Sequence, residues 1–256
     1  MTEECYNNDI HNFTHMITTI AKEVGYSNNE IEELVKANVE AFSFVISYLT
    51  SPSLYFSPIA HGSFKETYQP IGDKHKFVIK FISEDNETNL EEEILQLAAK
   101  QEVEQFFIPT TYMKLTSCTL PADLIAEDNG DPEEAPLCMI CVQPYATPAG
   151  DRTHVPLTGY YYQPDDTKRE NYRKNPLTCN DGKEVVDFDF ANRLNDIIED
   201  YTWWQLALDL YGLAAVEALA RFIEDNKITD LHDWNYGYMK KDDRVLPVIM
   251  DWLSGF

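Results

Sequence analysis

Apolar side chains recur at helical spacing in two segments at the start of the chain. Between residues 8 and 24 they stand three or four positions apart, and Gly25 follows as a typical helix stop. Residues 27–30 have the pattern of an N-cap serine with an acid three positions later, which predicts a second helix running to about Tyr48. We therefore predict an N-terminal helical extension over residues 1–52. Its apolar positions are Ile10, Phe13, Met16, Ile17, Ile20 and Val24 in the first helix, and Ile31, Leu34, Val35, Val39, Phe42 and Val45 in the second.

After this extension the pattern changes to short apolar runs separated by turn residues. The runs 76–82 and 137–142 have the length and composition of buried strands. A long stretch rich in proline and glycine, residues 147–184, predicts an irregular insertion. Two further helices are predicted over about 187–200 and 202–226, the second mostly buried.

Together these elements predict an α+β fold in three parts. The helical extension precedes a strand-rich lobe over residues 53–146. A mainly helical lobe follows over residues 147–256 and contains the irregular insertion.

Composition limits the classes of function. The chain has 256 residues, 44% of them apolar and 12% aromatic, which is typical of a folded globular protein. Its net charge of −24 argues against binding to nucleic-acid phosphates and favours basic partners. No stretch is apolar enough to span a membrane, and the acidic first residues lack a signal-peptide pattern. Five cysteines at irregular spacing indicate neither a disulfide framework nor a zinc site, so we expect a cytoplasmic protein.

Three polar residues near the end of the chain have the spacing expected for phosphoryl transfer. Asp230 precedes Asn235 by five positions, and Asp251 follows an apolar run over 246–250 that predicts a buried strand. Phosphoryl transfer needs a carboxylate to orient the acceptor hydroxyl and oxygen ligands to hold Mg²⁺. Asp230 is the candidate for the first role, and Asn235 and Asp251 are the candidates for the second. A polar loop without chemistry, made of residues common in turns, explains the same spacing.

A lysine also stands inside one of the predicted strands. Lys80 interrupts the apolar run 76–82, and a buried ammonium group needs a charged partner or a cleft. The acidic run 91–93 opens the next predicted helix, and within it Glu93 is the predicted partner, with Glu92 as the alternative. Acids in the first turn of a helix are also favoured by the helix dipole, without any further function.

These motifs resemble those of the protein-kinase-like superfamily. The string Asp-Leu-His-x-x-Asn at 230–235 and the string Ile-x-Asp-Trp at 249–252 are similar to its catalytic and metal-binding loops. The lysine that ends Phe-Val-Ile-Lys at 77–80 is similar to the lysine of the family's Val-Ala-Ile-Lys strand. The elements also stand in the family's order along the chain.

The resemblance implies an ATP- and Mg²⁺-dependent kinase with a bilobal fold. Lys80 would contact the ATP phosphates and pair with Glu93, with Glu92 as the alternative partner. Asp230 would be the catalytic base, and Asn235 and Asp251 would hold the metal. A covering loop and a hinge would bind the nucleotide, and the residues implied there are Gly62, Ser63, Phe64, Gln143 and Tyr145.

Within this superfamily the layout is similar to the truncated early serine/threonine kinases of short-tailed bacteriophages. Two details depart from the family pattern: Ile228 replaces a histidine, and no glycine follows Trp252. Only five residues follow Asp251 in the sequence, which predicts a minimal second lobe. The resemblance implies phosphorylation of host proteins, and the net charge of −24 favours host proteins with basic surfaces. Two alternatives stay open: an acidic protein on a weak or inactive kinase-like scaffold that inhibits a basic nucleic-acid-binding host protein, and a small-molecule kinase, which His232 favours.

Overall fold

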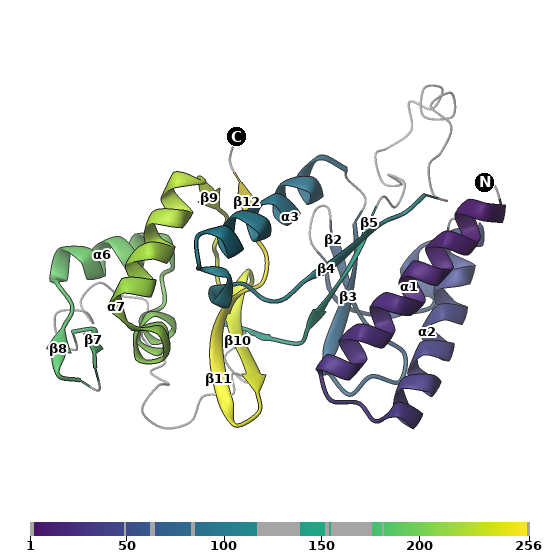
Figure 1. The fold of residues 1–256 in the computed structure, drawn as a ribbon, viewed down its shortest axis with the longest axis horizontal. Helices are drawn as coiled ribbons and strands as arrows, with labels where there is room; N and C mark the ends of the chain where they lie inside the picture. Colours follow the sequence, from purple (N-terminus) through teal and green to yellow (C-terminus); the bar gives the residue numbers. More distant parts are fainter. Residues whose placement is uncertain are drawn as a thin grey trace. The chain divides into compact units, whose positions relative to one another are not determined.

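The computed structural model describes residues 3–48, 50–61, 65–82, 85–116, 139–151, 154, 176–180 and 182–254. These residues form five α-helices and several antiparallel sheets, which confirms the α+β class (Figure 1). The predicted covering-loop residues Gly62, Ser63 and Phe64 lie outside the described residues, as does most of the predicted insertion. The chain divides into two compact units, Met1–Asn89 with Pro109–Tyr145, and Leu90–Ile108 with Ala146–Phe256.

Two long helices open the first unit, as the apolar spacing predicts. Helix α1 spans Glu3–Glu23 and α2 spans Asn28–Tyr48. Between them Gly25 has φ 79°, a left-handed conformation that glycine adopts without strain. Ser27 donates from its amide and its hydroxyl to the Glu30 carboxylate at 2.9 and 2.7 Å, and these hydrogen bonds lower the pKa of Glu30 to about 2.

A five-stranded antiparallel sheet completes the first unit. Its strands lie in the order β1-β2-β3-β5-β4, so the third strand is central. The strands are β1 (Ser57–His61), β2 (Lys65–Gln69), β3 (Phe77–Ile82), β4 (Thr111–Lys114) and β5 (Met139–Pro144), with a short 3₁₀ helix at Pro52–Leu54 before β1. The predicted strand over 76–82 is confirmed within one residue, and the one over 137–142 is described from Met139 onward.

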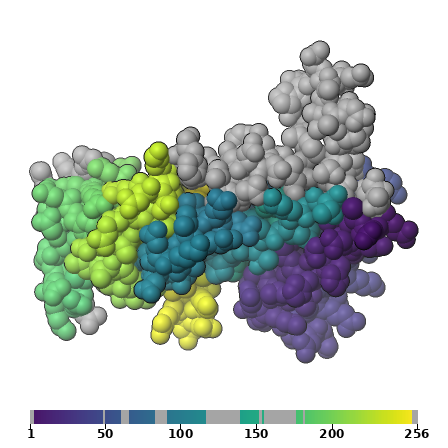
Figure 2. Space-filling model, turned by 45° about the horizontal axis from the view of Figure 1, so that its top comes forward, coloured from purple at the N-terminus to yellow at the C-terminus, as the bar shows by residue number. Residues whose placement is uncertain are grey.

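One face of this sheet packs on the helical pair. Strand side chains alternate between faces, and Phe77, Ile79 and Phe81 share a buried cluster with the helices. Within that cluster the rings of Phe13 and Phe42 stack at 4.2 Å between centroids. The helices and the sheet therefore share one hydrophobic core, and α1 and α2 form one continuous surface in the space-filling view (Figure 2).

Buried polar contacts also join the helical pair to the sheet. The Tyr26 hydroxyl donates to the Asp73 carboxylate at 2.5 Å, just before β3. The Asn38 side chain exchanges two hydrogen bonds of 2.9 Å with the main chain of Ile71. Asp9, fully buried in α1, accepts from the amide and hydroxyl of Thr116. The predicted helical extension thus belongs to the same compact unit as the sheet.

The described residues of the second unit contain three α-helices and a β-hairpin. Helix α3 (Asp85–Lys100) enters it at Leu90, and a 3₁₀ turn follows at Glu104–Phe106. Its later elements are β6 (Thr147–Pro148), β7 (Thr178–Cys179), β8 (Glu184–Val185), α6 (Phe188–Ile197), α7 (Tyr201–Asp225), β9 (Ile228–Thr229), β10 (Tyr236–Lys241), β11 (Arg244–Ile249) and β12 (Leu253–Ser254). Three antiparallel sheets result: β11-β10-β6, β12-β9 and β7-β8; the first contains the yellow hairpin of Figure 1.

The long helix α7 differs from its prediction in one respect. A continuous helix was expected over about 202–226, but Gly212 has φ 79° and ψ 169°, which are not helical values. That backbone conformation is accessible to glycine because it has no Cβ. The preceding segment is buried on nearly every side, from Thr202 to Leu208, whereas the segment after the break has both buried and exposed positions. The glycine therefore divides α7 where its burial changes.

Candidate functional site

The predicted catalytic loop connects β9 to β10, and the side chain of Asn235 joins its two ends. Asn235 donates from Nδ2 to the Asp230 main-chain carbonyl at 2.7 Å and to Asp230 Oδ2 at 3.1 Å. Asp230 has φ 61°, a left-handed conformation that short polar residues tolerate better than others. The five-residue spacing of the two residues thus lets the amide of Asn235 hold both the turn and the carboxylate of Asp230.

Asp251 is brought to the same loop by main-chain hydrogen bonds. The Asn235 carbonyl accepts from the amides of Met250 at 2.8 Å and Asp251 at 3.0 Å. Just beyond, β9 and β12 pair antiparallel, with Leu253 opposite Thr229. Residues from two distant parts of the sequence are thereby joined, and Asn235 contacts both Asp230 and Asp251.

His232 lies beside the Asp230 carboxylate within this loop. Its Nδ1 accepts a hydrogen bond of 3.2 Å from the Trp234 amide, and its Nε2 lies 3.6 Å from Asp230 Oδ1. A neutral imidazole whose Nδ1 accepts carries its proton on Nε2. That N–H therefore faces one carboxylate oxygen of Asp230, and the amide of Asn235 holds the other.

Two glycines allow a neighbouring segment to lie directly against the loop. A Cβ on Gly237 would stand 2.1 Å from the Thr147 carbonyl oxygen, because β6 and β10 pair there. A Cβ on Gly150 would stand 2.8 Å from the indole of Trp234, and the Gly150 amide donates to the Asp233 carbonyl at 2.6 Å. Neither glycine could be identified from the sequence, because the requirement for each comes from close contacts between segments far apart in the chain.

The donor set around Asn235 fits a magnesium ion. Since Nδ2 of Asn235 faces Asp230, its Oδ1 is directed away from that bond, and the main-chain amide of Asp251 is bonded to the Asn235 carbonyl. Amide and carboxylate oxygens are the ligands that Mg²⁺ prefers, and it commonly takes only one or two from protein. Among the described residues no group of three or more His, Cys, Asp or Glu side chains gathers as a metal site. A magnesium site here would therefore have two protein ligands, Asn235 and Asp251.

Lys80 lies in the first unit, on the central strand β3. It is buried, with 8% of its surface exposed, opposite Thr67 of β2 and Cys141 of β5. Because its strand neighbours Ile79 and Phe81 face the helical pair, Lys80 points to the other face of the sheet. Lys80 is thus buried on one face of the sheet, as its position inside an apolar run predicts.

The structure distinguishes the three consecutive glutamates of α3 by their burial. Glu92 and Glu93 are exposed, whereas Glu91 is buried with 6% of its surface accessible. The direction in which α3 presents its core-facing residues, Ile94 and Ala98, places Glu91 on the buried side and Glu93 on the solvent side. Glu91 is thus the buried acid of this helix, and the pairing of Lys80 with Glu93, or with Glu92 as the alternative, stays a prediction.

The predicted hinge residues are engaged in contacts within the first unit. Gln143 is buried and donates from Nε2 to the Thr110 hydroxyl at 3.0 Å. The Tyr145 amide donates to the Lys76 carbonyl at 2.8 Å, and its ring lies edge-on to His75 at 5.9 Å. The backbone N–H of Tyr145 is thus already satisfied by protein, which leaves nucleotide binding by this hinge as a prediction.

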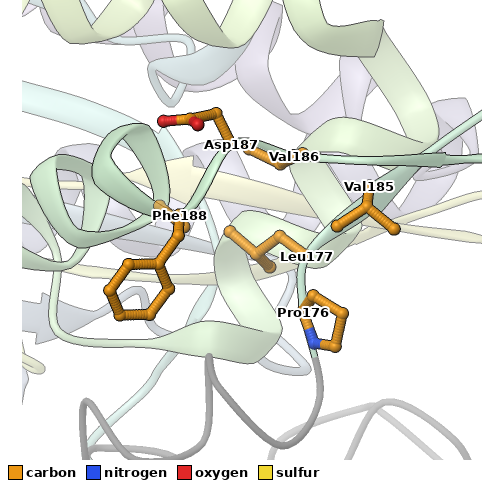
Figure 3. A pocket seen from close by; sticks show the side chains of 7 residues that line it. Pro176, Leu177, Val185, Val186, Asp187 and Phe188 are labelled. Carbon is orange, nitrogen blue, oxygen red and sulfur yellow. The ribbon is translucent and has the colours of Figure 1, made fainter.

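The second unit also contains a pocket of about 410 Å³, between β7, β8 and the start of α6 (Figure 3). The Asp187 carboxylate at its edge caps α6 by accepting from the amides of Asp189 and Phe190. The remaining walls are largely apolar, and no predicted site residue is among them. The lining residues are Pro176, Leu177, Val185, Val186, Asp187, Phe188 and Ala191.

Comparison of the chain with protein-family models, with curated proteins and with solved structures gives no match. None of the described helices combines the length and apolarity needed to cross a membrane. The proposed function therefore rests on the geometry of the loop 230–235 and on the sequence motifs.

Proposed function

We propose that this protein is an ATP- and Mg²⁺-dependent protein kinase that transfers phosphate to serine or threonine of host proteins, as a phage-encoded enzyme would. The carrying observation is the position of Asn235. Its side chain holds Asp230 and its carbonyl holds the amide of Asp251, so the three residues named for phosphoryl transfer share one loop cluster. A turn that served only to connect two strands does not require this combination.

Asp230 is the proposed catalytic base. Its side chain is 45% exposed, so a substrate hydroxyl can reach the carboxylate from solvent. Asn235 donates to one of its oxygens and His232 Nε2 lies 3.6 Å from the other, so the carboxylate has a defined orientation toward an incoming hydroxyl. Orientation of this kind is the main protein contribution to phosphoryl transfer, together with electrostatic stabilisation.

Asn235 Oδ1 and the Asp251 carboxylate would hold Mg²⁺, which when bound neutralises charge on the phosphates. The role of Lys80 at the ATP phosphates is proposed from its sequence motif alone; within the first unit its side chain is buried on the central strand. In this proposal the fold is kinase-like, with a strand-rich lobe and a reduced helical lobe. A buried lysine on the central strand of a five-stranded antiparallel sheet supports that assignment.

The net charge of −24 supports basic protein surfaces as substrates. Opposite charge on the two partners raises the rate of encounter, and the same charge disfavours nucleic acid as a direct ligand. The proposed partners are therefore host proteins that present basic surfaces.

The test is phosphate transfer from labelled ATP with Mg²⁺, to the protein itself and to a basic acceptor protein. Asp230→Asn and Asp251→Asn should each lower the transfer rate by roughly 10²- to 10⁴-fold, because one removes the base and the other weakens the metal site. Asp243→Asn is the matched control, since Asp243 is an exposed acid at the β10–β11 turn. Equal labelling by all four proteins would refute the kinase assignment.

A second candidate is an acidic binding protein on a kinase-like scaffold with weak or no activity. The observations that favour it are the high negative charge and the Tyr145 amide, which is already bonded within the protein. It would occupy a basic, nucleic-acid-binding surface of a host protein. If Asp230→Asn and Asp251→Asn keep both partner affinity and biological effect while no transfer is measured, this candidate replaces the first.

A further inference from the structure

Trp234 differs from every other tryptophan of the chain in its exposure. Trp203, Trp204 and Trp252 have 0–1% of their surface exposed, whereas Trp234 has 56% exposed. A large apolar ring is normally buried, because its contact with water is unfavourable. An exposed indole in the proposed catalytic loop therefore identifies a surface at which a ligand can gain contact area.

The indole is supported from one side by protein main chain. Gly150 lies so close that a Cβ there would come within 2.8 Å of Trp234 Cε2 and 2.9 Å of Nε1. The Gly150 amide is fixed to the Asp233 carbonyl at 2.6 Å, and the Trp234 amide donates to His232 Nδ1 at 3.2 Å. A ring held in this way loses little conformational freedom when a ligand binds to its open face.

The charges next to the ring are negative. Between Ile228 and Tyr236 the sequence contains Asp230 and Asp233 and neither lysine nor arginine. Both carboxylates belong to exposed residues, and Asp233 directly precedes Trp234. An aromatic face attracts a cation through its quadrupole, most strongly when the ring is tryptophan, and neighbouring carboxylates add to that attraction. They repel the phosphates of a nucleic-acid strand, the other common ligand of exposed aromatic rings.

We propose that Trp234 and Asp233 form a subsite for a cationic side chain, preferably arginine, of the polypeptide substrate. Arginine fits best because its planar guanidinium stacks on an aromatic face while its N–H groups bond to a carboxylate. The proposal rests on the proposed function in one respect, namely that the polypeptide is the phosphoryl acceptor. It adds a specificity element: a basic residue near the acceptor serine or threonine, whose hydroxyl meets Asp230.

Trp234 provides its own optical probe for the test. The other three indoles are buried, so the solvent-exposed part of the tryptophan emission belongs to Trp234. Two synthetic peptides of equal length would be titrated without ATP, one with arginine beside a central serine and one with citrulline in its place. Citrulline preserves the shape of arginine and removes its charge. The arginine peptide should shift the emission and bind roughly 3- to 30-fold more tightly.

Variants separate the ring from the charge. Trp234→Leu should abolish the preference for arginine over citrulline, Trp234→Phe should keep part of it, and Asp233→Asn should reduce it. Asp243→Asn, an exposed acid outside the loop, should leave it unchanged. The Trp234 variants lack the exposed indole that reports peptide binding, so their peptide affinities are measured by calorimetry. Equal affinity for the two peptides in the parent protein would overturn the proposal, as would an unchanged preference in Trp234→Leu.

Failure of this subsite and failure of the kinase assignment give different results. Arginine-selective binding without phosphate transfer keeps the cation site and removes the proposed reaction. Phosphate transfer with no difference between the two peptides, in affinity or in kcat/KM, keeps the reaction and removes the subsite. A single-stranded oligonucleotide that displaces the arginine peptide would assign the ring to base stacking instead and overturn the proposal.

Discussion

Asn235 donates from one amide nitrogen to both the main-chain carbonyl and the carboxylate of Asp230, at 2.7 and 3.1 Å. The same residue accepts the amide of Asp251 through its carbonyl. One side chain and one carbonyl thus connect the two acids on which the proposed chemistry depends. Asn235 is consequently the residue at which a small change should separate catalysis from folding most clearly.

Replacing Asn235 with aspartate tests this connection. Asn235→Asp keeps the size and a metal-binding oxygen, but it removes the N–H donor and places a second negative charge against Asp230. Transfer should fall by roughly 10²-fold or more, while the melting temperature falls only slightly because the loop is exposed. Activity and thermal unfolding are measured on the same preparation. Full activity in Asn235→Asp would show that the amide donor has no catalytic role.

Lys80→Met tests the lysine of β3. Methionine preserves much of the side-chain volume, so the protein should fold, although an acid that pairs with Lys80 would be left uncompensated at a cost of about 3 kcal/mol. Stabilisation by added ATP and Mg²⁺ should shrink, and transfer should fall by orders of magnitude. Lys114→Met is the matched control, since Lys114 is exposed on the edge strand β4. An ATP response that Lys80→Met leaves intact would remove Lys80 from the nucleotide site.

Glu91 and Glu93 provide a matched pair on one helix. Glu91→Gln changes a buried acid and should lower the free energy of unfolding by about 1–3 kcal/mol, because its interactions in the interior are weakened. Glu93→Gln changes an exposed acid and should have an effect within about 0.5 kcal/mol. Chemical denaturation of both variants measures the difference. A larger loss for Glu93→Gln would contradict the burial of Glu91 and the exposure of Glu93.

Gly237→Ala should destabilise the protein more than an ordinary glycine substitution. The new Cβ would stand 2.1 Å from the Thr147 carbonyl oxygen, so β6 and β10 must separate. Overpacking of this kind costs about 1–3 kcal/mol or more. Gly182→Ala is the comparison: its Cβ meets nothing within 4 Å, and only the strain of its φ of 77° applies, about 1 kcal/mol. Equal losses of stability in the two variants would mean that the strands do not approach so closely.

Tyr26→Phe tests the contact between the helical pair and the sheet, and it has a defined pH dependence. Burial and the hydrogen bond to Asp73 raise the pKa of Tyr26 from 10.0 to about 12. Because the folded protein holds the proton more tightly than the unfolded chain, this group stabilises the fold fully below pH 10, and the contribution is lost between pH 10 and about 12.

The variant should therefore be less stable than the parent by about 1–3 kcal/mol at neutral pH, since Asp73 loses its donor. The difference in melting temperature between the two proteins should narrow as the pH rises from 10 to 12. A difference that stays constant over this range would show that the Tyr26 proton is not linked to folding.

Local patterns in the sequence were sufficient for the elements that depend on near neighbours. The 3.6-residue period of α1 and α2, and the apolar runs of β3, β5 and β11, identify the helices and strands because burial of one face or of both requires that pattern. The pair Asp230 and Asn235 could be named as a unit because its hydrogen bonds span only five residues. The kinase function itself stays a prediction.

Only the tertiary structure decided the features that depend on packing between distant segments. Three consecutive glutamates lie in the middle of α3, and the sequence alone does not determine which of them is buried. The orientation of the helix on its core buries Glu91. The same is true of Trp234, whose exposed ring rests against Gly150, and of Gly237, which β6 requires to be small. The burial and close contacts of these residues depend on packing between segments distant in the sequence, which the local order of residues does not determine.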